Sequence, residues 1–381
     1  MKFRIVIFFS TLLLVTLSCK EKTKDDTIVN VRKSIGGIYI DTVKCFPTNS
    51  SLVGFWALVN NDVVFCDQIF GTISFFDRDG NETRVSLGLG EGPSETAGIY
   101  GLSSKSDESI SILNSFTVES FNKELILERK IPIKWNTENL SYRQLENDPQ
   151  PDLSGIYEIL WRPKGINNLV KSYKRGMLLP IGSTHPLFNG YMHEKYYEEA
   201  AIFGLIDPES GEFIKLGGTR GDIYLEKPFI PNFDFISYDV LQEEIHVTFG
   251  PDPAVYVFDQ EFNKILKYGT YPDGFKHDYH QTRDYNSAEE RWRKDMRSYG
   301  YNDWLYCDEK TNRVFRTVKP TGVNGPSVLQ VYEDQVLVGE LDVPERFRVV
   351  GRIGDEYIAD GIVDEENFKL AYYRFKLKVA K

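Results

Sequence analysis

The sequence predicts an all-β protein, namely a six-bladed β-propeller whose ring is closed by strands from both ends of the chain. The first observation is a β-hairpin in residues 72–95, where two alternating runs flank the tight turn from Asp77 to Gly80 and a glycine-rich loop follows. The second is that partial copies of this hairpin return in residues 203–222 and 255–274. The third is that short strands come in groups of four, which is typical of propeller blades.

The spacing of these hairpins supports a repeat of nearly constant length. In the three clear copies an Asp precedes the turn and a Gly follows the second strand, and the two are 11, 10 and 10 residues apart. The apolar residues before successive turns lie 45, 85, 52, 73 and 44 residues apart, at Phe76, Phe121, Ile206, Phe258, Val331 and Phe375. The two long gaps hold a proline-rich region and an inserted helix, so the period is about 45 to 50 residues. We therefore count six blades, and the alternative is a seventh blade hidden in residues 135–200.

Strands are expected wherever apolar and polar residues alternate or a short apolar run lies between turn residues. The expected strands are residues 36–43, 63–66, 72–76, 83–87, 98–103, 109–113, 118–122, 124–131, 156–160, 176–181, 201–206, 212–216, 233–238, 245–249, 255–258, 265–268, 304–307, 313–318, 327–332, 336–341, 347–353, 357–360 and 373–379. Their short connections favour antiparallel meanders. The sixth blade lacks one strand, and we expect residues 36–43 to supply it by pairing with residues 373–379, which would also remove an exposed edge.

One segment has a helical period instead. Residues 287–290, Ser-Ala-Glu-Glu, fit a capping box, and Ala288, Trp292, Met296 and Tyr299 fall on one helical face. We therefore expect one short inserted helix at about residues 287–299, with this face buried.

The first residues have the layout of an export signal. A basic start precedes a mostly apolar run in residues 5–17, which is too short to span a bilayer, where about 20 residues are needed. The end of this run is similar to a bacterial lipobox, in which Cys19 becomes the lipidated first residue. We expect a signal peptide in residues 1–18, a lipidated tether in residues 19–34 and a single propeller domain in residues 35–381.

The residues around Cys19 also suggest a location. Thr16 stands where lipoboxes usually carry Leu, so cleavage by the ordinary signal peptidase is the alternative to lipidation. The charged residues 20–22, Lys-Glu-Lys, resemble the lipoprotein export signal of Bacteroidetes. That resemblance implies an outer-membrane lipoprotein on the cell surface, and the periplasmic face of the same membrane is the alternative.

Composition excludes several classes of partner and scaffold. The formal net charge is −11, so the chain gains nothing from the phosphate attraction that drives nucleic-acid binding. Besides Cys19 there are three cysteines, Cys45, Cys66 and Cys307, which is not the pattern of a disulfide scaffold, and a single disulfide stays open. Cys66 and Cys307 have similar neighbours, and we expect both to be buried strand residues at equivalent positions of two blades.

The hairpin and its loop carry a family resemblance. The lipobox, the repeated hairpins with an apolar residue and an Asp before the turn, and the Gly-Glu-Gly-Pro-Ser-Glu loop at residues 90–95 look like the six-bladed, NHL-like β-propeller lipoproteins of Bacteroidetes. The resemblance covers nearly the whole mature chain, although only residues 72–95 match closely. Most members of this family are uncharacterised, so the resemblance implies fold and location and supplies no catalytic residues.

Two motifs of the first hairpin invite a ligand-binding interpretation. The glycines at 88, 90 and 92 resemble a phosphate loop, but Pro93 and a return to strand follow instead of the helix N-terminus that such a loop requires. Asp77 and Asp79 resemble the start of a calcium loop that lacks its distal Glu. We interpret the first as a connection between blades and the second as a hairpin turn.

Histidine offers no clear catalytic or metal site. His277 and His280 are the one close pair, and zinc requires three or four ligands. His185, His193 and His246 stand alone and form no recognisable set with a nucleophile. We therefore assign no catalytic residue, no metal and no cofactor.

An aromatic and polar cluster in residues 275–304 is the best candidate for ligand binding. Aromatic rings with polar tips stack on sugars and fill recognition pockets. We expect Trp292 and Tyr299 to be buried by the helix, whereas Tyr279, His280 and Tyr301 lie outside that face and are the expected ligand contacts.

The leading functional hypothesis is a non-enzymatic, lipid-anchored propeller that binds a small molecule, a glycan or an envelope protein at one mouth of its channel. Loops between blades and the insertion in residues 270–304 would shape that mouth. The alternatives are a hydrolase or lyase acting on a carbohydrate or lactone, because fold does not fix function, and a structural component of an envelope complex.

Overall fold

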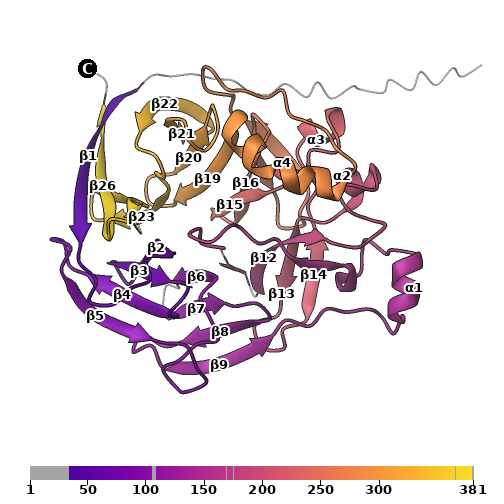
Figure 1. Ribbon diagram of the computed structural model, residues 1–381, viewed down its shortest axis with the longest axis horizontal. Coiled ribbons are helices and arrows are strands. Elements are labelled where there is room, and N and C mark those ends of the chain that lie inside the picture. Colours follow the sequence, from indigo (N-terminus) through magenta and orange to yellow (C-terminus); the bar gives the residue numbers. More distant parts are fainter. Residues whose placement is uncertain (1–33, 105–108, 169, 175, 365, 380–381) are drawn as a thin grey trace, which may run out of the picture.

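The protein is a ring of six antiparallel sheets around a central axis (Figure 1). The structure is a computed structural model, and it describes residues 34–104, 109–168, 170–174, 176–364 and 366–379. Each sheet is one blade, and neighbouring blades along the chain are neighbours in the ring. The expected six-bladed β-propeller is confirmed.

Each blade is built from four main strands. Blade 1 comprises β2 (Gly54–Val59), β3 (Asp62–Asp67), β4 (Thr72–Phe76) and β5 (Glu82–Leu87), and blade 2 comprises β6 (Gly101–Ser104), β7 (Ile110–Leu113), β8 (Thr117–Phe121) and β9 (Leu127–Pro132). Blade 3 comprises β10 (Tyr157–Ile159), β11 (Lys171–Tyr173), β12 (Gly176–Ser183), β13 (Phe203–Ile206) and β14 (Phe213–Gly217). Blade 4 comprises β15 (Ile236–Leu241), β16 (Glu244–Phe249), β17 (Val255–Phe258) and β18 (Lys264–Tyr268). Blade 5 comprises β19 (Tyr301–Asp308), β20 (Arg313–Lys319), β21 (Ser327–Glu333) and β22 (Val336–Val343). Blade 6 comprises β23 (Val349–Ile353), β24 (Glu356–Ala359), β25 (Val363–Asp364), β26 (Lys369–Val379) and β1 (Ile35–Cys45).

The two ends of the described chain close the ring together. β1 pairs antiparallel with β26 along its whole length, from Ile35 opposite Val379 to Cys45 opposite Leu370. β1 is therefore the outermost strand of blade 6, as the sequence predicts, and β26 has no free edge. The end of β1 also contacts blade 1, where the backbone of Gly80 has a φ of 86° and approaches the Lys44 carbonyl so closely that a Cβ atom would lie 1.9 Å from its oxygen.

The repeated turn is held by its own side chain. The Asp77 carboxylate accepts hydrogen bonds from the backbone N–H groups of Asp79 and Asn81, both at 2.9 Å. Three other blades use the same device, with Asn122, Asp207 and Asp259 as acceptors of two backbone N–H groups each. The pairing of the third and fourth strands shifts just before the turn in five blades, next to Phe76, Phe121, Ile206, Phe258 and Tyr332. The predicted repeat is confirmed, and the Asp77 carboxylate stabilises the turn of the first hairpin.

The helices lie on the half of the ring formed by blades 3 to 5 (Figure 1). They are α1 (Tyr142–Asn147), α2 (Lys195–Glu199), α3 (Ile223–Glu226) and α4 (Tyr285–Ser298), with 3-10 turns η1 (Ser154–Ile156) and η2 (Pro231–Phe233). The inserted helix that the sequence predicts is α4. It begins two residues earlier than expected, because the carboxylate of Asp284 accepts the N–H of Ser287 at 2.7 Å. The expected capping box at Ser287 is therefore wrong.

The buried face of α4 matches the expected one in part, because Met296 and Tyr299 are partly buried against the core whereas Trp292 is not. Ala288 is buried as expected, but Trp292 is 42% exposed, and the other fully buried residue of the helix is Asp295. Asn232 of η2 donates hydrogen bonds to the Ala288 carbonyl at 3.0 Å and to the Asp295 carboxylate at 2.9 Å. These polar contacts fix the rotation of the helix so that Trp292 points away from the core.

The innermost strand of blade 3 is interrupted, and the residues in the interruption lie near the central axis of the ring. β10 pairs with one end of β12 and β11 with the other, so the innermost strand of this blade is split. Residues 160–168 leave the sheet and contact blades 2 and 1, where Asn167 exchanges hydrogen bonds with the backbone of Leu102 and the Gly165 N–H donates to Gln68. The described part of residues 135–200 therefore holds this excursion, α1 and α2, and no seventh blade.

The three described cysteines are buried in strands with free thiols. Burial raises the pKa of Cys45 to about 12 and that of Cys307 well above its usual value. The expected equivalence of Cys66 and Cys307 is wrong, because Cys66 lies in β3, the second strand of its blade, and Cys307 in β19, the first.

The predicted signal peptide, the lipidated Cys19 and the tether up to residue 33 lie outside the described residues. Among the described residues, no helix has both the length and the apolar character needed to cross a membrane.

His246 provides a pH-sensitive contribution to the stability of blade 4. It is buried in β16, with its Nδ1 atom 2.9 Å from the Tyr268 hydroxyl, and burial lowers its pKa to about 4. An unfolded histidine has a pKa near 6.5, so between pH 6.5 and about 4 the unfolded state binds one more proton than the folded state. We expect neutral His246 to contribute fully to the free energy of unfolding above pH 6.5. This contribution, on the order of 3 kcal/mol, should be lost as the pH falls to about 4.

Urea unfolding between pH 7 and 4 measures this effect. His246→Gln should flatten the dependence of the unfolding free energy on pH, whereas replacement of the exposed His193 by Gln should leave it unchanged. An equally steep dependence in the His246 variant would show that this residue does not cause it.

Candidate functional site

A cavity of about 790 Å³ lies at the mouth of the propeller where the innermost strands begin. Its wall includes Tyr301 and Asp303 at the start of β19 and Arg348 just before β23. Residues 160–166 of the blade 3 excursion line it from one side, and α4 contributes Trp292, Arg293, Met296 and Arg297. Its size is that of pockets that enclose a drug-sized ligand.

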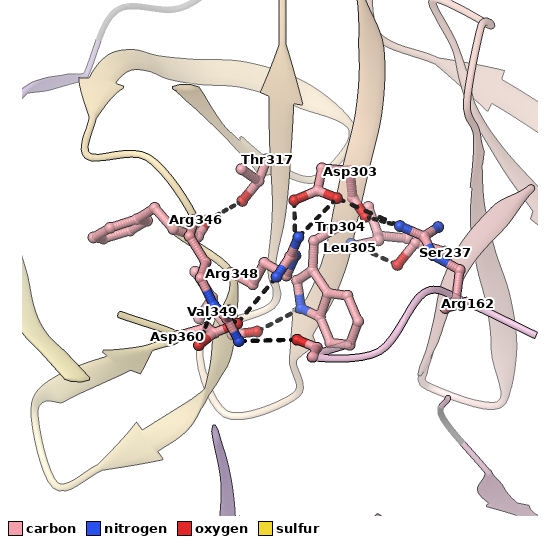
Figure 2. Close-up of polar contacts among 12 residues, drawn as sticks. Arg162, Ser237, Asp303, Trp304, Leu305, Thr317, Arg346, Arg348, Val349 and Asp360 are labelled. Carbon is pink, nitrogen blue, oxygen red and sulfur yellow. Dashed lines mark hydrogen bonds and ion pairs between the residues drawn. The ribbon is translucent and has the colours of Figure 1, made fainter. Parts of the chain in front are cut away.

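The floor of this cavity is a buried network of charges centred on Asp303 (Figure 2). Asp303 is 2% exposed and accepts hydrogen bonds from Arg348 Nε at 2.7 Å and Arg348 Nη2 at 3.2 Å. Arg162 Nη2 lies 3.4 Å from the same carboxylate and donates to the Asp303 carbonyl at 3.0 Å. Burial alone would raise the pKa of Asp303, but Arg348 and Arg162 hold it below its usual value. Burial lowers the pKa of Arg162 to about 10, so it stays protonated at neutral pH.

The network continues to blade 6 and blade 1. Arg348 Nη1 donates to Asp360 at 3.1 Å, and Arg346 Nε donates to the same carboxylate at 3.1 Å. Arg346 Nη2 also donates to the carbonyls of Gly54 at 2.9 Å and Gly165 at 3.0 Å. Side chains from blades 3, 5 and 6 are thus tied together across the axis, and the floor is rigid.

Two tryptophans are exposed in this cavity. Trp161 is 37% exposed and packs against Tyr100 at 5.3 Å between ring centroids, and Trp292 of α4 is 42% exposed. The rings of Phe235 and Tyr301 lie in the same wall and contact each other edge to face at 5.8 Å. Large aromatic rings that stay accessible in a cavity offer surface on which a ligand can stack.

Lys319 is the most unusual polar residue of the wall. It ends β20, is 2% exposed, and its Nζ atom makes no hydrogen bond within the part of the chain that the structure describes. Burial lowers its pKa, while Asp303 and Glu345 act to raise it and Arg348 to lower it. A buried amine without a hydrogen-bond acceptor is unfavourable.

The wall as a whole is basic, although the chain is acidic. Seven basic residues line the cavity, namely Arg162, Lys164, Arg293, Arg297, Lys319, Arg346 and Arg348. The acidic residues of the lining are Asp234, Asp303 and Glu345, so the lining has a formal excess of four positive charges. Asp360 beneath the floor reduces this excess to three.

A second cavity, of about 1070 Å³, lies at the opposite mouth, where the innermost strands end. Its charges are balanced and mostly paired, with Lys171 at 2.8 Å from Asp239 and Arg352 at 3.1 Å from Asp308. A void of about 20 Å³, lined by Arg162, Asn167 and Trp304 among others, shares lining residues with both cavities. The excursion of blade 3 therefore separates the mouths, and the larger cavity offers fewer features that select a ligand.

The structure separates the three residues that the sequence predicts as ligand contacts. Tyr301 lines the cavity beneath α4. Tyr279 is 5% exposed, donates its hydroxyl hydrogen to the Gly300 carbonyl at 2.8 Å and packs on Phe233 at 4.6 Å. His280 is half-buried, and neither it nor Tyr279 lines this cavity.

The other motifs of the sequence have structural roles. The glycine-rich loop joins β5 to β6, and the N–H of Gly92 donates to the Glu95 carboxylate at 2.7 Å, as expected of a connection between blades. The ring of His277 stacks on Tyr271 at 5.4 Å. No group of three or more His, Cys, Asp or Glu residues suited to a metal ion occurs among the described residues.

Two of the solved structures that match this fold come from Bacteroides. The chain superimposes on a member of the duf4221 family from Bacteroides vulgatus with a TM-score of 0.64 and 13% identity, over 92% of this chain and 100% of that chain. It also matches an exported protein from Bacteroides fragilis with a TM-score of 0.51 and 12% identity, over 93% of this chain and 98% of that chain. No protein-family model and no curated protein sequence matches the chain. At these identities the likeness concerns the fold alone.

Proposed function

We propose that this protein is an exported, lipid-anchored propeller of the cell envelope, held in the outer membrane through Cys19, which binds a small molecule or glycan at the mouth beneath α4. The observation that carries the proposal is that Trp161 and Trp292, from different parts of the fold, are both exposed in one cavity of about 790 Å³. Exposed aromatic faces in a concave site are typical of ligand recognition.

The rigidity of the floor supports binding. Arg348 and Arg346 are held by two carboxylates and by backbone carbonyls of other blades, so their positions are set before a ligand arrives. A site that is already ordered loses little side-chain entropy on binding.

The same floor favours binding over hydrolysis or elimination. A general acid or base needs a carboxyl group that is free to exchange a proton. Asp303 and Asp360 are both ion-paired with arginines, and Asp234 is paired with Arg220 at 2.8 Å. Among the acidic residues that line the cavity, only Glu345 forms no ion pair with a described residue.

Single substitutions of the two tryptophans test the proposed site. A thermal-shift screen against glycans and small metabolites identifies ligands, because a ligand bound only by the folded state raises the apparent Tm. Trp161→Ala and Trp292→Ala should each lower the affinity for such a ligand about fivefold or more, since stacking contributes on the order of 1 kcal/mol or more per ring. Both variants should stay folded and unfold cooperatively without ligand, because more than a third of each tryptophan is exposed and neither lies in the core.

Tyr285→Ala is a matched control. Tyr285 is 59% exposed on the same helix but does not line the cavity. Equal affinities in the Trp161, Trp292 and Tyr285 variants would overturn the proposed site.

A further inference from the structure

Three basic residues of the cavity wall have no acidic partner among the residues that the structure describes. The side chains of Lys164, Arg293 and Arg297 are exposed and form no ion pair or hydrogen bond with any residue that the structure describes. In contrast, many exposed basic residues elsewhere do pair, for example Lys195 with Glu199 at 3.7 Å and Lys376 with Asp355 at 2.7 Å.

The acids near these residues do not neutralise them. Asp234 is occupied by Arg220, and Asp303 by Arg162 and Arg348. Glu345 is the acidic residue of the lining without a partner among the described residues. Its single negative charge is outnumbered by the three unpaired bases and by Lys319. The field inside the cavity is therefore positive, although the whole chain carries −11.

Lys319 is an independent observation that points to a ligand. Its amine is buried and has no hydrogen-bond partner within the described ranges, yet it lines the cavity beside Asp303 and Arg348. An oxyanion from a ligand would supply the missing acceptor and offset the unfavourable burial.

We infer that the ligand of this mouth is an acidic saccharide, whose sugar ring stacks on Trp161 or Trp292 and whose carboxylate or sulfate group binds Lys319 together with Arg293 or Arg297. The inference rests on the proposed function, because it assigns a ligand class to the same cavity. The aromatic rings recognise the sugar and the unpaired bases recognise the acid, so neither feature alone accounts for the wall.

The unliganded protein offers a first test. Lys319→Met keeps the length of the side chain and removes its charge, so the Tm without ligand should rise. A residue that costs stability is typical of a functional site. A Tm that falls would show that the amine supports the fold, and the assignment of Lys319 to the ligand would be overturned.

The second test uses saccharides that differ only in charge. Calorimetric titration compares oligosaccharides that contain glucuronate, oligosaccharides that carry sulfate esters, and neutral oligosaccharides of the same linkage. We expect acidic members to bind at least about tenfold more tightly than their neutral counterparts, with an affinity that falls as salt rises. The carboxylate and sulfate arms show which acid group is preferred.

Variants locate the acid group. Lys319→Met and the double change Arg293→Ala with Arg297→Ala should each reduce the preference for the acidic member at least about tenfold, whereas Lys294→Ala, which removes an exposed charge of α4 outside the cavity, should not. Neutral saccharides that bind as tightly as acidic ones, with a dependence on Trp161 and Trp292, would overturn the acidic class and leave the proposed site standing. Failure of every acidic saccharide to bind at millimolar concentration would overturn the inference.

Discussion

Asp303→Asn is expected to lower the free energy of unfolding by about 3 to 5 kcal/mol, the usual effect of removing one partner from a buried ion pair. Asparagine preserves the shape of the side chain, so the loss reports the charge. It leaves Arg162 and Arg348 facing each other without the carboxylate that accepts from both. Because these arginines come from blade 3 and from the connection into blade 6, the damage should extend across the axis.

Chemical denaturation of the variant and of a matched control measures the effect. The control is Glu199→Ala, which removes an exposed ion pair with Lys195. The Lys195 side chain is 64% exposed and the Glu199 side chain 45%. Exposed pairs of this kind contribute about 0.5 kcal/mol or less. Equal losses in the two variants would mean that the axial network does not hold the blades together.

Removal of β1 should have an effect of similar or larger size. A chain that begins at residue 47 lacks the outermost strand of blade 6, and β26 then becomes an unpaired edge. It also loses Val43 and Cys45, which pack with Trp56 and Tyr372 where blade 6 meets blade 1. We expect this chain to be aggregated or partly unfolded under conditions in which a chain that begins at residue 34 is soluble and folded.

A peptide added in trans tests whether the defect of the shortened chain comes from the missing pairing between β1 and β26. A synthetic peptide of residues 34–46 should restore solubility and cooperative unfolding to the shortened chain, because it can pair with β26 in place of β1. A peptide of the same composition in scrambled order should not. A shortened chain that unfolds at the same Tm as the longer one would contradict closure by β1.

The fold could largely be predicted from local pattern. Outer strands such as β5 and β9 are mostly exposed, and an Asp or Asn at the turn marks the outer hairpin of four blades. β2, with the sequence Gly-Phe-Trp-Ala-Leu-Val, was not among the expected strands. It is an inner strand buried on nearly all sides, which leaves a continuous apolar run without alternation.

The candidate site was harder to predict, because its residues come together only when the ring closes. Arg162, Asp303 and Arg348 are separated by 141 and 45 residues along the chain, and no spacing rule joins them. The helix was predicted, but its rotation depends on Asn232 in another segment, so the exposure of Trp292 could not be foreseen. One local pattern existed: Arg346 and Arg348 alternate with apolar residues just before β23, where innermost strands begin.

A crystal structure of the protein with a glucuronate-containing or sulfated oligosaccharide is the most direct measurement of where and what it binds. We expect the sugar in the cavity beneath α4, with a ring against Trp161 or Trp292 and the acid group within hydrogen-bond distance of Lys319 Nζ. A saccharide bound at the opposite mouth, between Asp239 and Arg352, or one bound beneath α4 with its acid group turned to solvent, would contradict this.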